Sequence, residues 1–315
     1  MKPINNNYMK KLNLLFLLFS CFSFAQESKL FHPELFSGLP NVRDFSMSKN
    51  QDEFYFTVES YLKEYSFIAY SKKINGKWQK PEVVSFSGQY KDLEPFLSPN
   101  GLQLFFASNR KDSNSGEVKN DMDIWYVTRN SLNDKWSEPI NIGTTVNTNA
   151  DEFYPSVTEK GDLFFTAEYK NNTTGKEDIY VSRLVNGEYT KPTPLSSGVN
   201  SDKYEFNAFV APDESFIIFT SYGRKDDLGR GDLYISKKGS NNEWLPATHL
   251  TNINSNKLDY CPFVDLQTNT LYFTSSTSSI PKVLPKKMTL SEFQEYLNTN
   301  PNGLSRIYVS PFIKK

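Results

Sequence analysis

Four acidic residues occupy one position of a repeated sequence pattern, and their side chains have the clearest capacity for chemistry in this chain. They are Asp92, Glu152, Glu205 and Asp259. Asp44 and Glu94 add carboxylates at the next position of the same alternation. Carboxylates that converge on one point can coordinate a hard cation such as Ca²⁺. A pair of them can also act as acid and base on a glycosidic bond.

Three interpretations of these carboxylates remain open. In the first, Asp92, Glu94, Glu152, Glu205 and Asp259 bind a ligand or an ion, and we expect no cofactor apart from a hard cation such as Ca²⁺ in that case. In the second, a glycoside hydrolase or lyase uses Asp44, Glu94, Glu152 and Glu205. In the third, each carboxylate accepts backbone hydrogen bonds within the repeat. Recurrence in four copies favours this structural role, because a catalytic site is normally asymmetric.

Basic side chains recur in the polar loops between the apolar segments. Arg110, Lys170 and Arg224 lie at similar places in loops rich in Gly, Asn and Asp. Loops carried by a rigid scaffold are a common place for binding residues. We therefore add Arg110 and Arg224 to the candidate ligand-binding residues.

Several common kinds of active site are not indicated. The two histidines, His32 and His249, are far apart and show no metal-ligand spacing. The chain contains neither a Gly-x-Ser-x-Gly elbow nor a phosphate-binding loop. A net charge of −1 provides no basic field for nucleic acid. The expected partner is therefore a protein or a glycan, and we expect a monomer.

The elements that position the acidic residues are strands of an all-β repeat. Five copies can be aligned, starting near residues 42, 91, 151, 203 and 258. Each copy has an "EPFLS"-like segment, a turn such as Ser98-Pro99-Asn100-Gly101, a strongly apolar segment such as "LQLFFAS", a "DIWYV" segment, and a last segment after Trp or Tyr. Four short strands bounded by turn residues are typical of one propeller blade. The sequence predicts a five-bladed β-propeller of four-stranded antiparallel blades.

The last copy lacks a fourth strand and carries an insertion. The segment "KLFHPELFSG" at 29–38 resembles "KWQKPEVVSFSG" at 77–88, so we predict that an N-terminal strand completes the last blade. Residues 280–303 interrupt that blade. Thr289 followed by Glu292 fits a capping box, which predicts a short helix that is either decoration or has a role as a partner-binding element or a lid.

The first 25 residues have the features of a secretory signal peptide. Lys10 and Lys11 precede an apolar run, and Ser23-Phe24-Ala25 fits a cleavage site. Cleavage leaves a propeller domain from residue 26 to 315 with no transmembrane segment, in the periplasm or secreted. An outer-membrane lipoprotein attached through Cys21 is the alternative. Cys261 is then the single remaining cysteine, which excludes an internal disulfide, and its apolar surroundings favour a core role.

The pattern "EPFLSPNGLQLFFASNR…DIWYV" resembles the WD-like propeller repeat of the TolB-type family. The resemblance covers nearly all of the chain after residue 25. It implies a propeller that acts as a non-enzymatic binding or scaffold module of the bacterial cell envelope, engaging a protein or glycan on one face of the ring. The alternative is a carbohydrate-active enzyme, because five-bladed propellers also host glycosidases.

Overall fold

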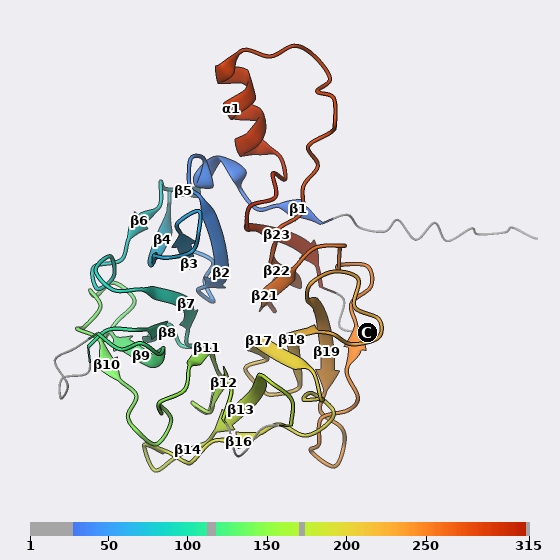
Figure 1. Ribbon diagram of the computed structural model, residues 1–315. Helices are drawn as coiled ribbons and strands as arrows, with labels where there is room; N and C mark the ends of the chain where they lie inside the picture. The colour runs from blue at the N-terminus through green and yellow to red at the C-terminus, as the bar shows by residue number, and fades with distance from the viewer. Residues whose placement is uncertain (1–27, 112–117, 170–173, 313–315) are drawn as a thin grey trace, which may run out of the picture.

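The protein is a ring of five β-sheets around a central axis (Figure 1). The structure is a computed structural model, and it describes residues 28–111, 118–169 and 174–312. The predicted signal peptide and Cys21 lie outside the described residues, as does Lys170. The predicted five-bladed propeller is confirmed.

The strands follow the predicted order within each blade. Blade 1 contains β2 (Asn41–Met47), β3 (Glu53–Glu59) and β4 (Ser66–Ile74), with β5 (Lys77–Trp78) and β6 (Glu82–Val83) both paired to β4. Blade 2 contains β7 (Asp92–Leu97), β8 (Gln103–Ser108), β9 (Asp123–Thr128) and β10 (Ile140–Asn141). Blade 3 contains β11 (Glu152–Val157), β12 (Leu163–Ala167), β13 (Asp178–Ser182) and β16 (Thr193–Pro194). A hairpin of β14 (Leu184–Val185) and β15 (Glu188–Tyr189) extends from blade 3.

Blade 4 contains β17 (Tyr204–Val210), β18 (Phe216–Tyr222), β19 (Asp232–Lys237) and β20 (Thr248–His249). Blade 5 contains β21 (Asp259–Asp265), β22 (Thr270–Ser275) and β23 (Arg306–Pro311), and β1 (Lys29–Leu30) is its outermost strand. The first strands β2, β7, β11, β17 and β21 surround the axis (Figure 1).

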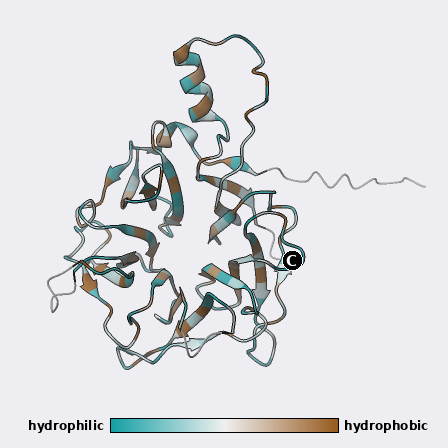
Figure 2. Cartoon of the chain, viewed as in Figure 1, coloured by the Kyte–Doolittle hydropathy of each residue, from teal (hydrophilic) through white to brown (hydrophobic). Residues whose placement is uncertain are grey.

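The second strand of each blade is almost entirely buried, because a neighbouring blade covers each of its faces. In β3 every residue is buried, and in β12 Leu163, Phe164 and Phe165 have no exposed surface. Strands covered on both faces need continuous apolar runs rather than alternation, which explains segments such as "LFFTA". Apolar residues accordingly gather in the strands while polar residues dominate the outer loops (Figure 2).

The N-terminal strand closes the ring as predicted. β1 pairs antiparallel with β23, and the amide of Phe31 donates to the carbonyl of Ile307 at 2.9 Å. The Phe31 ring then packs edge-on against Phe45 and Phe54 of blade 1 and Tyr272 of blade 5. One aromatic side chain therefore joins the first blade to the last.

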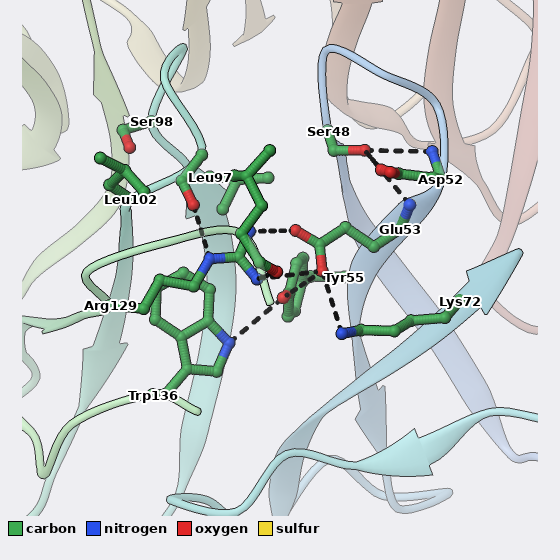
Figure 3. Close-up of polar contacts among 12 residues, drawn as sticks. Ser48, Asp52, Glu53, Tyr55, Lys72, Leu97, Ser98, Leu102, Arg129 and Trp136 are labelled. Carbon is green, nitrogen blue, oxygen red and sulfur yellow. Dashed lines mark hydrogen bonds and ion pairs between the residues drawn. The ribbon is translucent and has the colours of Figure 1, made fainter. Parts of the chain in front are cut away.

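Buried ion pairs join neighbouring blades away from the axis. Arg129 of blade 2 bonds both carboxylate oxygens of Glu53 in blade 1 and also donates to the carbonyl of Gly101 at 2.8 Å (Figure 3). Its guanidinium stacks 4.4 Å from the Trp136 ring centroid. Trp78 and Trp244 stack with lysines in the same way, at 4.5 Å in both cases. The recurrent tryptophans are thus part of the blade structure.

The insertion in blade 5 projects from the rim of the ring (Figure 1). It contains α1 (Leu290–Thr299), capped by the predicted box between Thr289 and Glu292. The helix contacts the 3₁₀ helix η1 (Pro33–Phe36), yet none of its residues is buried. Within the part of the chain described, no helix has both the length and the apolar character to cross a membrane.

Candidate functional site on the propeller axis

Each of the five first strands contains a β-bulge at the same position. The pairing with the second strand shifts register there, and the first residue of each bulge has a positive φ. These residues are Asp44, Glu94, Tyr154, Asn207 and Cys261, with φ of 61°, 61°, 53°, 50° and 54°. A residue other than glycine rarely adopts such a φ without a compensating role. Bulges re-aim side chains, and these five aim toward the axis.

Contacts between blades that are not neighbours show that these side chains meet at the axis. The side-chain amide Nδ2 of Asn207 in blade 4 lies 3.4 Å from Glu94 Oε1 in blade 2. The hydroxyl of Tyr154 in blade 3 donates to the carbonyl of Pro262 in blade 5 at 3.2 Å. We call the five bulge residues the axial ring.

Arg43, the residue before the blade 1 bulge, binds the carboxylates of the axial ring. Its Nε lies 2.8 Å from Asp44 Oδ1, and its Nη2 lies 2.8 Å from Glu94 Oε1. Its Nη1 is 3.5 Å from Glu59 Oε1, and Cys261 Sγ is 3.5 Å from Nη2. One cation therefore contacts three carboxylates and a thiol. The guanidinium also lies over the ring of Tyr260, 5.1 Å from its centroid.

A hydrogen bond that the bulge residues of several blades share explains the position of the Glu94 carboxylate. In three blades the backbone amide of the bulge residue donates to the hydroxyl of a threonine in the preceding blade. These bonds run from Asp44 to Thr274 at 3.3 Å, from Glu94 to Thr57 at 2.9 Å and from Asn207 to Thr166 at 3.1 Å. Blade 2 has Ala107 at the threonine position, opposite Leu93. The amide of Tyr154 donates instead to Glu94 Oε2 at 2.7 Å.

Burial controls the protonation of the axial ring. It raises the pKa of Glu94 to about 8, although Arg43 acts in the opposite direction. It also raises the pKa of the Cys261 thiol well above its usual range, with Asp44 adding to the effect. A buried thiol with a raised pKa is a poor nucleophile, which agrees with the predicted core role of Cys261.

The four recurrent acidic residues lie in a different place from Asp44 and Glu94. Asp92, Glu152, Glu205 and Asp259 have no exposed surface and lie at the first or second residue of their first strands. Glu152, Glu205 and Asp259 each accept bonds from the backbone amide and hydroxyl of a Ser or Thr four residues earlier, namely Thr148, Ser201 and Ser255. Each of these three fixes the loop that enters its own first strand.

The two candidate arginines bind these same acidic residues. Arg110 lies 2.6 Å from Asp92 and donates to the carbonyl of Phe86 at 3.2 Å. Arg224 lies 2.9 Å from Glu205 and donates to the carbonyl of Val199 at 2.6 Å. Of the predicted site residues, the structure therefore brings Asp44 and Glu94 together at the axis. It pairs Arg110 with Asp92 and Arg224 with Glu205 in their own blades, and it leaves Glu152 and Asp259 in two further blades.

Among the described residues, no group of three or more His, Cys, Asp or Glu side chains is arranged to hold a metal ion. At the axial ring, the guanidinium of Arg43 takes the place that a cation would need between Asp44 and Glu94.

Below the axial ring, four phenylalanines meet across the axis. Phe96 of blade 2 and Phe209 of blade 4 have ring centroids 6.4 Å apart, although their blades are not neighbours. Phe209 lies 5.4 Å from Phe263, which lies 5.9 Å from Phe45. All four are buried. We call this group the aromatic plug, and it separates the axial ring from the opposite mouth of the ring of blades.

The opposite mouth holds an apolar pocket with a volume of about 300 Å³. Its floor is formed by Phe96, Phe209 and Phe263 of the plug. Its walls come from Met47, Leu97, Pro99, Pro212, Val264 and Leu266. Lys49, Glu159, Asp213 and Asp265 stand around it. We call this the axial pocket. The sequence did not predict the axial pocket, because apolar residues at the ends of first strands have the same pattern as buried core residues.

Comparison with known proteins supports the fold. No model of a protein family matches the chain, and no curated protein matches it in sequence. Among solved structures, TolB from Acinetobacter baumannii is similar at 11% identity and a TM-score of 0.46, over 85% of this chain and 54% of that one. The chain thus spans about half the length of that TolB.

Two further structures match over more of their length. A protein described as TolB from Agrobacterium tumefaciens is similar at 13% identity and a TM-score of 0.48, over 86% of this chain and 90% of that one. A thermostable family-43 glycoside hydrolase is similar at 11% identity and a TM-score of 0.52, over 87% of this chain and 90% of that one. Identities this low show likeness of fold alone. The order of the strands in the sheets shows the predicted β-propeller with five four-stranded blades.

Proposed function

We propose that the protein is a non-enzymatic binding module of the bacterial cell envelope that receives an apolar side chain of a partner protein in the axial pocket. The observation that carries this proposal is the apolar pocket of about 300 Å³ on the side of the aromatic plug away from the axial ring. A volume of that size lies at the lower end of ligand pockets and suits one large side chain. The leader-like first 25 residues support export to the envelope.

The lining of the pocket favours a protein over a glycan. Its floor consists of aromatic rings, and its polar groups stand at the edge. Sugar hydroxyls placed on that floor would lose hydrogen bonds to water without replacement. An aliphatic or aromatic side chain would gain from burial instead, about 25 cal/mol per Å² of apolar surface.

The charges at the edge favour a basic neighbour on the partner. Glu159, Asp213 and Asp265 outnumber the single Lys49. Asp265 is held in place because its carboxylate accepts from Gln51, Thr268 and the amide of Gln267. A partner segment with an apolar residue beside Lys or Arg would complement both the floor and the edge.

The test uses capped tetrapeptides that carry Leu, Met, Phe or Trp next to Lys, with binding followed through the methyl resonance of Met47. We expect at least one peptide to shift that resonance. Leu266→Arg places a cation at the edge of the pocket and should abolish the shift. The matched control is Leu245→Arg in blade 4, because Leu245 is 47% exposed and Leu266 is 42% exposed.

A glycoside hydrolase is the second candidate, and one observation favours it. Asp44 and Glu94 converge on the axis, and the pKa of Glu94 is raised to about 8, as a general acid requires. Against it stands Arg43, which bonds both carboxylates. Hydrolysis of an aryl glycoside panel that disappears in Glu94→Gln, together with no peptide binding, would establish the enzyme and refute the binding module.

A further inference from the structure

The arm formed by residues 280–290 exposes apolar side chains that the fold does not use. Val283 is 82% exposed and Leu290 is 75% exposed, whereas most large apolar residues of the chain are buried. The arm runs out from β22 to the start of α1 and projects beyond the rim of the ring (Figure 1). Both side chains belong to one segment that projects from the ring, and apolar surface exposed in this way can mark an interaction site.

The same arm carries three lysines and no acidic residue. Lys282, Lys286 and Lys287 are all exposed, and the segment reads "IPKVLPKKMTL". Lys286 lies 2.7 Å from Glu292 in the first turn of α1. The arm is therefore basic and apolar at once, in a chain whose net charge is −1.

The structure holds the arm in place at both ends. Thr289 and Glu292 cap α1 through reciprocal bonds between side chain and backbone. At the base, the amide of Ser279 donates to the carbonyl of Pro301 at 2.9 Å, and the amide of Gly303 donates to the carbonyl of Thr277 at 2.9 Å. Pro281 and Pro285 restrict the backbone between these anchors. An anchored arm loses less conformational freedom on binding than a free tail does.

We propose that this arm binds the surface of a membrane rich in anionic lipids. Lys282 and Lys287 contact lipid phosphates, while Val283 and Leu290 enter the boundary between headgroups and acyl chains. A soluble polyanion would satisfy the lysines alone, whereas the exposed apolar side chains gain only from a phase that removes them from water. Basic residues beside apolar ones are the composition that such interfaces select.

The expected strength is modest and additive. Near an anionic surface each lysine raises affinity about fivefold, and Lys286 is already paired with Glu292, so Lys282 and Lys287 together give a gain of about 25-fold. This attraction falls as salt screens the charges. The membrane contact uses the rim and is independent of the axial pocket, so the failure of one proposal does not affect the other.

The experiment measures flotation of the purified protein with vesicles of phosphatidylglycerol and phosphatidylcholine, and with vesicles of phosphatidylcholine alone. We expect binding to the anionic vesicles at 50 mM NaCl and a clear loss at 300 mM. The triple variant Lys282→Gln, Lys286→Gln, Lys287→Gln should lose at least about tenfold in affinity. Val283→Ser with Leu290→Ser should also weaken binding.

The matched control is Leu62→Ser with Lys63→Gln, because Leu62 is 81% exposed and lies in the loop between β3 and β4. This control should bind as the parent protein does. Binding that is equal in all variants would overturn the proposal. So would competition by soluble glycerol phosphate combined with an unchanged Val283→Ser, Leu290→Ser variant, because the arm would then recognise a phosphate group and not a membrane.

Discussion

At the scale of single residues, Arg43 determines what the carboxylates on the axis can do. It bonds Asp44 and Glu94 and approaches Glu59, and its side chain is only 12% exposed. A buried cation among several carboxylates is difficult to replace, because removing it leaves negative charges without a partner in a medium of low polarity. The main role of Arg43 is therefore to stabilise the fold around the axis.

Replacement of Arg43 by Met should destabilise the protein by about 3–5 kcal/mol, the usual cost of breaking a buried ion pair. Urea unfolding followed by tryptophan fluorescence measures this loss. Adding Asp44→Asn to the same variant should restore part of the stability, since that unpaired charge is then gone.

Arg183→Met is the control for this prediction. Arg183 also bonds two carboxylates, those of Asp162 and Glu214, but its side chain is 39% exposed. Water screens such a pair, so the loss should stay near 1 kcal/mol or below. Equal losses for the two arginines would show that burial at the axis does not matter.

The sequence predicted some of these residues and missed others for a definable reason. Asp44 and Glu94 were found because both are acidic and align between copies. Tyr154, Asn207 and Cys261 occupy the same bulge position, but they share no chemical type with the acids, so a search by residue type passes over them. Counting two residues on from the recurrent acid in each copy would have found all but Asp44, whose copy has Val42 there.

At the scale of elements, the repeat made the blades predictable and the bulges unpredictable. Alternation and turn residues define where strands begin and end. A bulge adds one residue to one strand and leaves the apolar pattern nearly unchanged. The axial pocket was not predicted for a related reason. In the sequence its apolar residues look like core residues, and only the closed ring of blades shows that they line a pocket at one mouth.

The closure of the ring by β1 leads to a prediction for Phe31. Its side chain is 8% exposed and packs between blade 1 and blade 5. Phe31→Ala should lower the free energy of unfolding by about 3–5 kcal/mol, the usual cost of removing a buried phenylalanine. Guanidinium unfolding of the variant measures this. Leu62→Ala, at an 81% exposed position, should change stability by less than about 0.5 kcal/mol, and a similar loss in both would contradict a special role for closure.

At the scale of the whole molecule, buried carboxylates should make stability depend on pH. Burial raises the pKa of Glu94 to about 8, of Glu152 to about 7 and of Asp259 to about 6. The unfolded chain releases these protons near pH 4. Between these limits the folded state binds more protons than the unfolded state, so the free energy of unfolding falls as pH rises.

We therefore expect stability to decrease from pH 5 to pH 8, by up to about 1.4 kcal/mol per pH unit for each group that titrates. Guanidinium unfolding at four pH values across this range measures the slope. Glu152→Gln should make the slope shallower below pH 7, because it removes one of the three groups. A stability that rises with pH over this range would mean that the folded state keeps these carboxylates ionised.

The aromatic plug gives the molecule two faces that do not communicate through its centre. Phe96 and Phe209 meet across the axis, so the side chains of the plug stand between the two mouths of the ring. Two partners can therefore occupy opposite ends of the ring at once without competing. The propeller would then act as a spacer of fixed thickness between them.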